Sequence, residues 1–147
     1  MIKREITYDD FYNGEIQELT EIVYFNHTLM TLKRYEEEYG SYFYDDFNRI
    51  SKVIDFDKLS SGEISSNEGL DLMTNPIVNK FVQRVLPCMY AEVQDGLLVQ
   101  NQETFDNFNS APYFMEFMNF NFFTEIMNLV FKNQGKAPDK KGKTAKK

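Results

Sequence analysis

The sequence contains no tryptophan, one cysteine and one histidine, and these shortages exclude several classes of protein. The single Cys88 cannot form a disulfide within the chain, and the single His27 cannot supply a His-rich metal site. No uncharged apolar run approaches the roughly 18 residues of a membrane-spanning helix, and the N-terminal MIKREITYDD lacks the apolar segment of a signal peptide. We therefore expect a protein of the reducing cytoplasm that binds no metal and no membrane.

No arrangement of catalytic residues is found either. His27 has no serine or cysteine motif near it and is interpreted as a helix-capping or surface residue. Cys88 lies within an apolar stripe, which indicates a buried, unreactive thiol. Asp45-Asp46 and residues 55–57 lack EF-hand spacing, and the scattered glycines form no phosphate-binding loop. We expect a non-enzymatic protein without a cofactor. A pocket holding His27 beside paired carboxylates would instead favour the hypothesis that the protein is an enzyme.

Charge is distributed unevenly along the 147 residues, which the net charge of −7 conceals. Residues 132–147 hold seven Lys and one Asp, a net charge of +6, whereas residues 1–131 hold nine Lys and Arg against 22 Asp and Glu, a net charge of −13. The tail has no apolar periodicity, so residues 132–147 are expected to be disordered. Residues 1–131 are expected to form a single globular domain, whose negative charge disfavours nucleic-acid binding.

The first 25 residues predict a β-hairpin. Ile2, Ile6 and Tyr8 alternate with polar residues, and Asn13-Gly14 is a strong signal for a tight turn because both residues tolerate a positive φ. With a two-residue loop, opposite positions sum to 27, so that Ile2 faces Phe25.

Two details of this hairpin follow from the same register. Arg4 and Glu21 become diagonal neighbours that are able to form an ion pair. Phe11 and Ile16 match in register but lie on the face opposite to the other apolar residues. A β-bulge near Asp9-Asp10 is therefore expected.

Beyond the hairpin, apolar residues recur at helical spacing, which predicts a mainly α (α+β) fold with about five or six short helices. Asn26 or Thr28 caps the first helix and Gly40 ends it, while Asn75-Pro76 starts another that Pro87 should kink or break. Residues 60–67 are predicted as a loop and 94–96 as a turn before a short extended piece. The other predicted helical segments are 43–54, 68–73, 102–108, 110–118 and a last helix from 121.

Aromatic side chains are dense near the end of the chain, with seven between residues 113 and 131. The simplest interpretation is that they form the core. The alternative is that one domain cannot bury all of them, so that some form a surface for a partner or for self-association. The candidate partner-binding residues under this alternative are Phe114, Phe117, Phe122 and Phe123.

Four segments, taken in order, carry a resemblance to a known family. IKREITYDDFYNGEIQELTEIVYFN corresponds to an opening hairpin and LKRYEEEYG to a first helix. NPIVNKFVQRVLPCMYAEVQDG corresponds to a helix ending in a small turn, and ETFDNFNSAPYFMEFM through FFTEIMNLVF to a characteristic finish. Together they resemble the tail assembly chaperones of long-tailed, siphovirus-type phages. Residues 58–73 have no counterpart, and Pro87 departs from the family pattern.

The resemblance implies a chaperone that coats the apolar tape-measure protein and recruits tail-tube subunits, so that the tube assembles around the tape measure. It implies a place in the host cytoplasm and absence from the mature virion. Since coating a long client requires many copies, self-association is expected. Many relatives also make a longer form by ribosomal frameshifting, which A-rich codons for Gly135-Lys136 or Lys140-Lys141 would permit.

The charge of residues 1–131 leaves a second hypothesis open. An acidic adaptor or inhibitor of an unrelated family would mimic nucleic acid and bind a basic DNA-handling protein. Carboxylates clustered on one face would favour this hypothesis, and evenly scattered carboxylates would exclude it.

Overall fold

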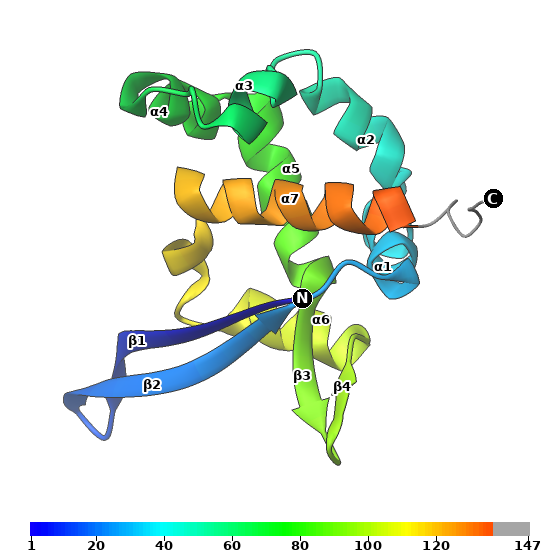
Figure 1. Cartoon of the computed structure of the whole chain (residues 1–147). Helices are drawn as coiled ribbons and strands as arrows, with labels where there is room; N and C mark the ends of the chain where they lie inside the picture. The colour runs from blue at the N-terminus through cyan, green and yellow to red at the C-terminus, as the bar shows by residue number, and fades with distance from the viewer. Residues whose placement is uncertain (137–147) are drawn as a thin grey trace.

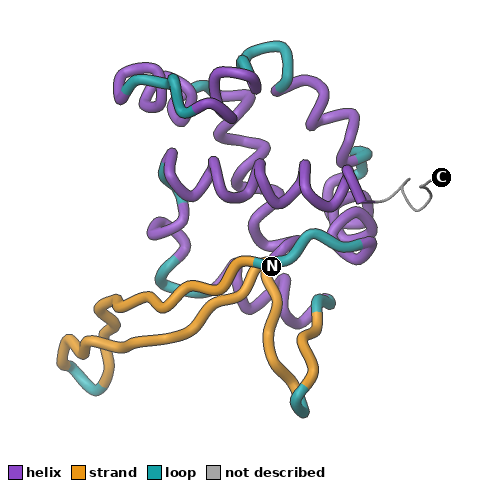
Figure 2. Tube along the Cα trace, viewed as in Figure 1, coloured by secondary structure: helices purple, strands orange, loops and turns teal. Residues whose placement is uncertain are grey.

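Two antiparallel hairpins share a root in the computed structural model, which describes residues 1–136 (Figure 1). The first arm is formed by β1 (Ile2–Tyr12) and β2 (Glu15–Phe25), and the second arm by β3 (Tyr90–Gln94) and β4 (Leu97–Val99). The strand order is β1-β2-β3-β4, but β2 and β3 pair only at two positions, Tyr24 with Ala91 and Phe25 with Tyr90. The two arms consequently diverge from the root at one end of the molecule (Figure 2).

Helices form the rest of the described chain, as the mainly α prediction implies. Seven α-helices and one 3-10 helix lie within residues 1–136, somewhat more than the five or six expected. They are α1 (Leu29–Tyr39), α2 (Phe43–Ile50), α3 (Phe56–Ser61), α4 (Ser66–Thr74), α5 (Pro76–Met89), α6 (Gln102–Ser110), η1 (Phe114–Phe117) and α7 (Phe120–Lys136).

The predicted register of the first arm is confirmed, since Ile2 lies opposite Phe25. At the turn, Asn13 has a φ of 52° and Gly14 a φ of 79°, the left-handed values that a two-residue hairpin turn requires. The bulge expected near Asp9-Asp10 is wrong, because pairing continues without interruption to Tyr12 and Glu15. Phe11 and Ile16 therefore keep the alternation and point away from the body.

The predicted pair between Arg4 and Glu21 is replaced by a longer-range contact. Arg4 belongs to the half-buried, body-facing side of β1 and forms an ion pair with Glu125 of α7. Its guanidinium also lies 5.9 Å from the ring centroid of Phe122. The arm is thus attached to the last helix near its root.

The largest difference from the predicted elements lies between residues 56 and 74. The predicted loop at 60–67 contains the end of α3 and the start of α4, because its polar residues act as helix caps. The Asp55 carboxylate accepts hydrogen bonds from the Asp57 and Lys58 amides, and Ser65 forms a capping box with Glu68. Composition that is typical of a loop therefore marks the end of one helix at Gly62 and the start of the next at Ser65.

Three further predictions are corrected nearer the C-terminus. α5 is not broken at Pro87 but continues to Met89, where the chain enters β3, a strand that was not predicted. The helix predicted at 110–118 is a short 3-10 turn. α7 continues to Lys136, five residues into the predicted disordered tail, and the remainder of that tail, residues 137–147, lies outside the described residues.

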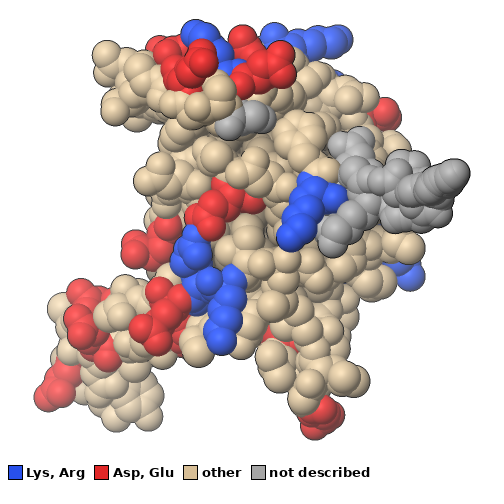
Figure 3. All heavy atoms as spheres, in the orientation of Figure 1, with Lys and Arg blue, Asp and Glu red and all other residues tan. Residues whose placement is uncertain are grey.

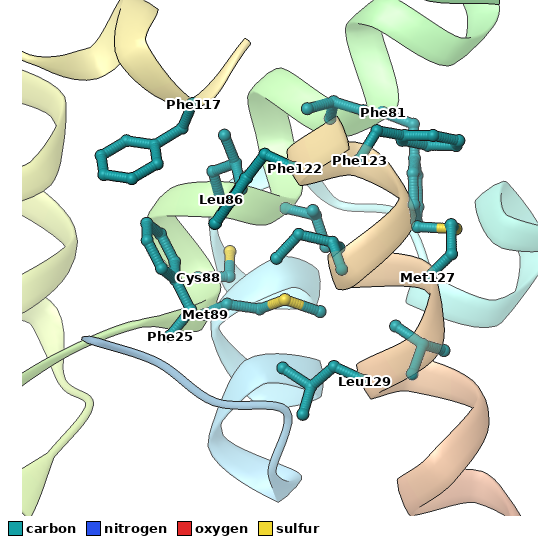
Figure 4. Packing of buried hydrophobic residues seen from close by; sticks show 14 of the residues in the cluster. Phe25, Phe81, Leu86, Cys88, Met89, Phe117, Phe122, Phe123, Met127 and Leu129 are labelled. Carbon is teal, nitrogen blue, oxygen red and sulfur yellow. The ribbon is translucent and has the colours of Figure 1, made fainter. Parts of the chain in front are cut away.

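The core forms where α7 crosses α5 above the root of the two arms (Figures 1 and 4). Phe25 of β2 is fully buried and its ring lies 5.0 Å from Phe117, 5.1 Å from Phe122 and 5.6 Å from Phe108, in edge-to-face contacts. Such aromatic pairs each add about 0.5–1.5 kcal/mol beyond burial. Phe25 thereby joins the sheet to α6, η1 and α7.

His27 is neither the helix cap nor the surface residue that was expected, since Thr28 caps α1. Only 6% of it is exposed, its ring lies 5.1 Å from Phe43, and its Nε2 lies 3.2 Å from the Tyr44 hydroxyl. Burial disfavours the charged imidazolium and lowers the pKa of His27 from 6.5 to about 4. The histidine therefore stays neutral in the folded chain at neutral pH.

The contacts of Phe25 predict that Phe25→Ala lowers the free energy of unfolding by about 3–5 kcal/mol, because it removes a ring that four aromatic residues contact. Phe11→Ala in the same arm is the matched control, since Phe11 is 70% exposed, and should change stability by less than about 1 kcal/mol. Urea denaturation measures both variants. Equal effects would contradict the assignment of Phe25 to the core.

The buried His27 predicts a pH dependence of stability. The pKa of His27 is lower in the folded chain than in the unfolded chain. As the pH falls from 6.5 to about 4, the unfolded chain therefore binds a proton at His27 that the folded chain does not bind, and stability falls. The resulting loss reaches about 3 kcal/mol at pH 4 and is absent above pH 7. Urea denaturation of His27→Gln and the unaltered chain across this range isolates the effect, because the carboxylates are common to both. Parallel curves would contradict it.

Candidate binding surfaces

The four aromatic residues predicted to bind a partner lie mainly inside the protein. Phe117, Phe122 and Phe123 are each less than 5% exposed and belong to the central core (Figure 4). Phe114 is half-buried and its ring lies 5.4 Å from Phe108. The simpler interpretation, that this aromatic cluster forms the core, therefore holds for three of the four residues, and the exposed apolar residues lie elsewhere.

Seven of the 16 exposed large apolar side chains in the described residues lie on the two arms. On the first arm, Phe11 and Ile16 are directly opposite each other and are 70% and 73% exposed, and Tyr12 is exposed on the other face of the hairpin. On the second arm, Val93 and Leu98 are likewise directly opposite and exposed. The in-register match of Phe11 with Ile16 was visible in the sequence, but its position on the outward face pointed to a bulge instead of a surface.

The first arm is also strongly acidic. Residues 5–24 contain six Asp and Glu and no Lys or Arg, and all six carboxylates are exposed. They are Glu5, Asp9, Asp10, Glu15, Glu18 and Glu21. The arm therefore presents apolar side chains within a negative field.

On the face shown in Figure 3, the carboxylates form separate groups. One group covers the first arm and another covers the end of the molecule formed by α3 and α4, with Lys and Arg side chains between them. A protein that mimics nucleic acid requires a continuous row of negative charge, and this face does not supply one.

A hollow of about 280 Å³ lies between α1, α2 and α5. Its lining has a net positive charge, opposite to that of the first arm. Arg49 of α2 and Lys80 and Arg84 of α5 line it, together with one carboxylate, that of Asp46. Ile77 and Phe81 provide an apolar side to the hollow, and Ile77 is 48% exposed.

Asp46 contacts three of the side chains that line the hollow, those of Tyr35, Arg49 and Arg84. The Tyr35 hydroxyl donates a hydrogen bond of 2.6 Å to Asp46 Oδ2, and burial together with this carboxylate raises the pKa of Tyr35, so the phenol stays protonated. An Arg49 guanidinium nitrogen lies 3.4 Å from Asp46 Oδ1, and one from Arg84 lies 3.8 Å from Oδ2. Since one carboxylate faces three cations, the hollow keeps a net positive charge.

The remaining candidate residues are structural. Cys88 is 1% exposed and burial raises the pKa of its thiol to about 12, which confirms the prediction of a buried thiol. Residues 36–38 are exposed, and Glu37 and Glu38 form ion pairs with Arg34. Within residues 1–136 no group of three or more His, Cys, Asp or Glu is placed to hold a metal ion. In the same range, no helix has the length and apolar character needed to cross a membrane.

The described residues thus offer three candidate binding surfaces, namely the outer faces of the two arms and the cationic hollow. The resemblance to phage tail assembly chaperones rests on the four sequence segments alone. Comparison of the chain with protein-family models, with curated proteins and with solved structures gives no match.

Proposed function

We propose that the protein is a non-enzymatic phage tail assembly chaperone that binds the tape-measure protein and recruits tail-tube subunits. The observation that carries the proposal is that two projecting arms with a common root each hold a directly opposed pair of exposed apolar side chains. Exposed apolar surface concentrated on projecting elements is typical of proteins that bind other proteins. The order of hairpin, first helix, capped helix and aromatic finish supports the same family.

The second arm is the better candidate for the client surface. Its inner face is held against α6, since Gln94 donates a hydrogen bond of 2.7 Å to Glu103, and Asn107 donates one of 3.1 Å to Glu92. Val93 and Leu98 lie on the other face of the same strands and remain exposed. An arm fixed on one side and apolar on the other presents its apolar residues without first having to be ordered, which lowers the entropic cost of binding.

The client chemistry follows from this surface. The apolar face of an amphipathic helix matches two short strands whose outward residues are Val93 and Leu98, and the tape-measure protein is a long helical, apolar chain. Such a complex would form in the host cytoplasm, with the chaperone released before the virion is complete. A longer, frameshifted form would carry the same arms.

The proposal predicts that the unaltered chain keeps the tape-measure protein of the same phage soluble when the two are co-expressed. Val93→Ser together with Leu98→Ser should weaken the complex at least about tenfold, because it removes several buried apolar groups that each contribute about 0.8 kcal/mol. Pull-down of a tagged chaperone and the soluble fraction of the client measure this.

The matched control is Val53→Ser together with Leu70→Ser, which removes two exposed apolar side chains away from both arms and should leave binding unchanged. Insolubility of the client beside the unaltered chain, or the absence of a complex, would contradict the proposed function. A loss of binding that is equal in both double variants would contradict the assignment to the second arm.

A further inference from the structure

The first arm carries more exposed apolar surface and more charge than the fold requires. Its contacts with the body end near Tyr8, whose ring lies 5.2 Å from that of Tyr113. A hollow bounded by Thr7, Asp9, Glu18 and Met115 marks the last place where the arm and the body approach each other. Residues 10–17 project past this point, and they include Phe11, Tyr12 and Ile16 together with Asp10 and Glu15.

The cationic hollow has an excess of positive charge, which is opposite to the excess of negative charge on the first arm. Residues 1–131 contain only nine Lys and Arg against 22 Asp and Glu, yet three of these cations and one carboxylate line the hollow. Arg49 has 70% of its side chain exposed and Lys80 is exposed. Ile77 and Phe81 add an apolar surface beside them. This surface suits an acidic segment that also carries apolar side chains.

We propose that the tip of the first arm of one copy docks in the cationic hollow of a second copy. The tip supplies carboxylates for Arg49 and Lys80 and apolar side chains for Ile77, so both charge and hydrophobicity are complementary. The pairing of two arms with each other is disfavoured because both are negative and have no cation between residues 5 and 24.

The contact must form between copies. α2 and the first turns of α5, which line the hollow, lie toward the end of the molecule opposite to the arms (Figure 1). An arm consequently does not reach the hollow of its own chain. Since the two contacting surfaces differ, each added copy leaves one arm and one hollow free, and head-to-tail contacts of this kind extend into rings or filaments.

The charge complementarity also sets the conditions under which the contact forms. Carboxylates and guanidinium groups at an exposed contact attract each other over about 10 Å at 0.1 M salt and over about 3 Å at 1 M salt. Self-association should therefore weaken as the salt concentration rises. It does not require the client of the proposed function, whose binding is measured separately, so a failure of this contact is distinguishable from a failure of that function.

The experiment is sedimentation velocity on the full chain over a range of concentrations. The unaltered chain should form dimers and larger species at low salt. Two variants should each raise the dissociation constant at least tenfold, namely Glu15→Lys with Ile16→Thr in the arm, and Arg49→Gln with Lys80→Glu in the hollow. The matched controls, Glu63→Lys and Lys33→Glu, change exposed charges outside both surfaces and should associate as the unaltered chain does.

Mixing the two variants tests the head-to-tail geometry. The arm variant keeps an intact hollow and the hollow variant keeps an intact arm, so an equimolar mixture should form a 1:1 dimer that does not grow further. Circular dichroism with thermal melting establishes that both variants fold. A monomeric unaltered chain, association of either variant like the unaltered chain, or a mixture that stays monomeric would overturn the proposal.

Discussion

The contact on which the rest of the structure depends is the burial of Phe25 at the root of the two arms. Phe25 is the last residue of β2, and it pairs with Tyr90 at the start of β3. Its ring meets the rings of Phe108, Phe117 and Phe122. One side chain thereby fixes where the sheet stops, where the last helix crosses and from which point both arms project.

The parts of the fold that follow from short-range rules were predictable from the sequence. The register of the first arm depends only on a two-residue turn and the alternation of side chains, and it is confirmed down to the pair of Ile2 with Phe25. The start of α5 at Asn75-Pro76 and the end of α1 at Gly40 are likewise local, since a cap acts within one turn. β3 was not predicted because its pairing partners in β2 are distant in the sequence. Ala91 pairs with Tyr24, 67 residues before it, and Tyr90 pairs with Phe25, 65 residues before it.

The binding surfaces were harder to predict, for a physical reason. A phenylalanine in a helix has the same local pattern whether it faces the core or a partner. Only the packing of α7 on the rest of the fold decides that Phe122, which contacts Phe25 and Phe117, is buried, and that Phe123 is buried too. The cationic hollow is composed of residues from three helices, so no short sequence motif predicts it. Phe11 and Ile16 were easier to place, because the register of the hairpin was predicted correctly. Without the expected bulge, this register puts both side chains on the outward face.

The arms also separate the demands of folding from those of binding. A core residue such as Phe25 is constrained by every ring around it, whereas Phe11, Ile16, Val93 and Leu98 contribute little to the core and are exposed. Exposed apolar side chains on a projecting arm favour aggregation unless something limits the contact. On the first arm, six carboxylates repel a like-charged neighbour, and under the proposed docking they favour a partner that carries cations. The negative charge of that arm would thus make binding by its apolar tip selective for positively charged surfaces.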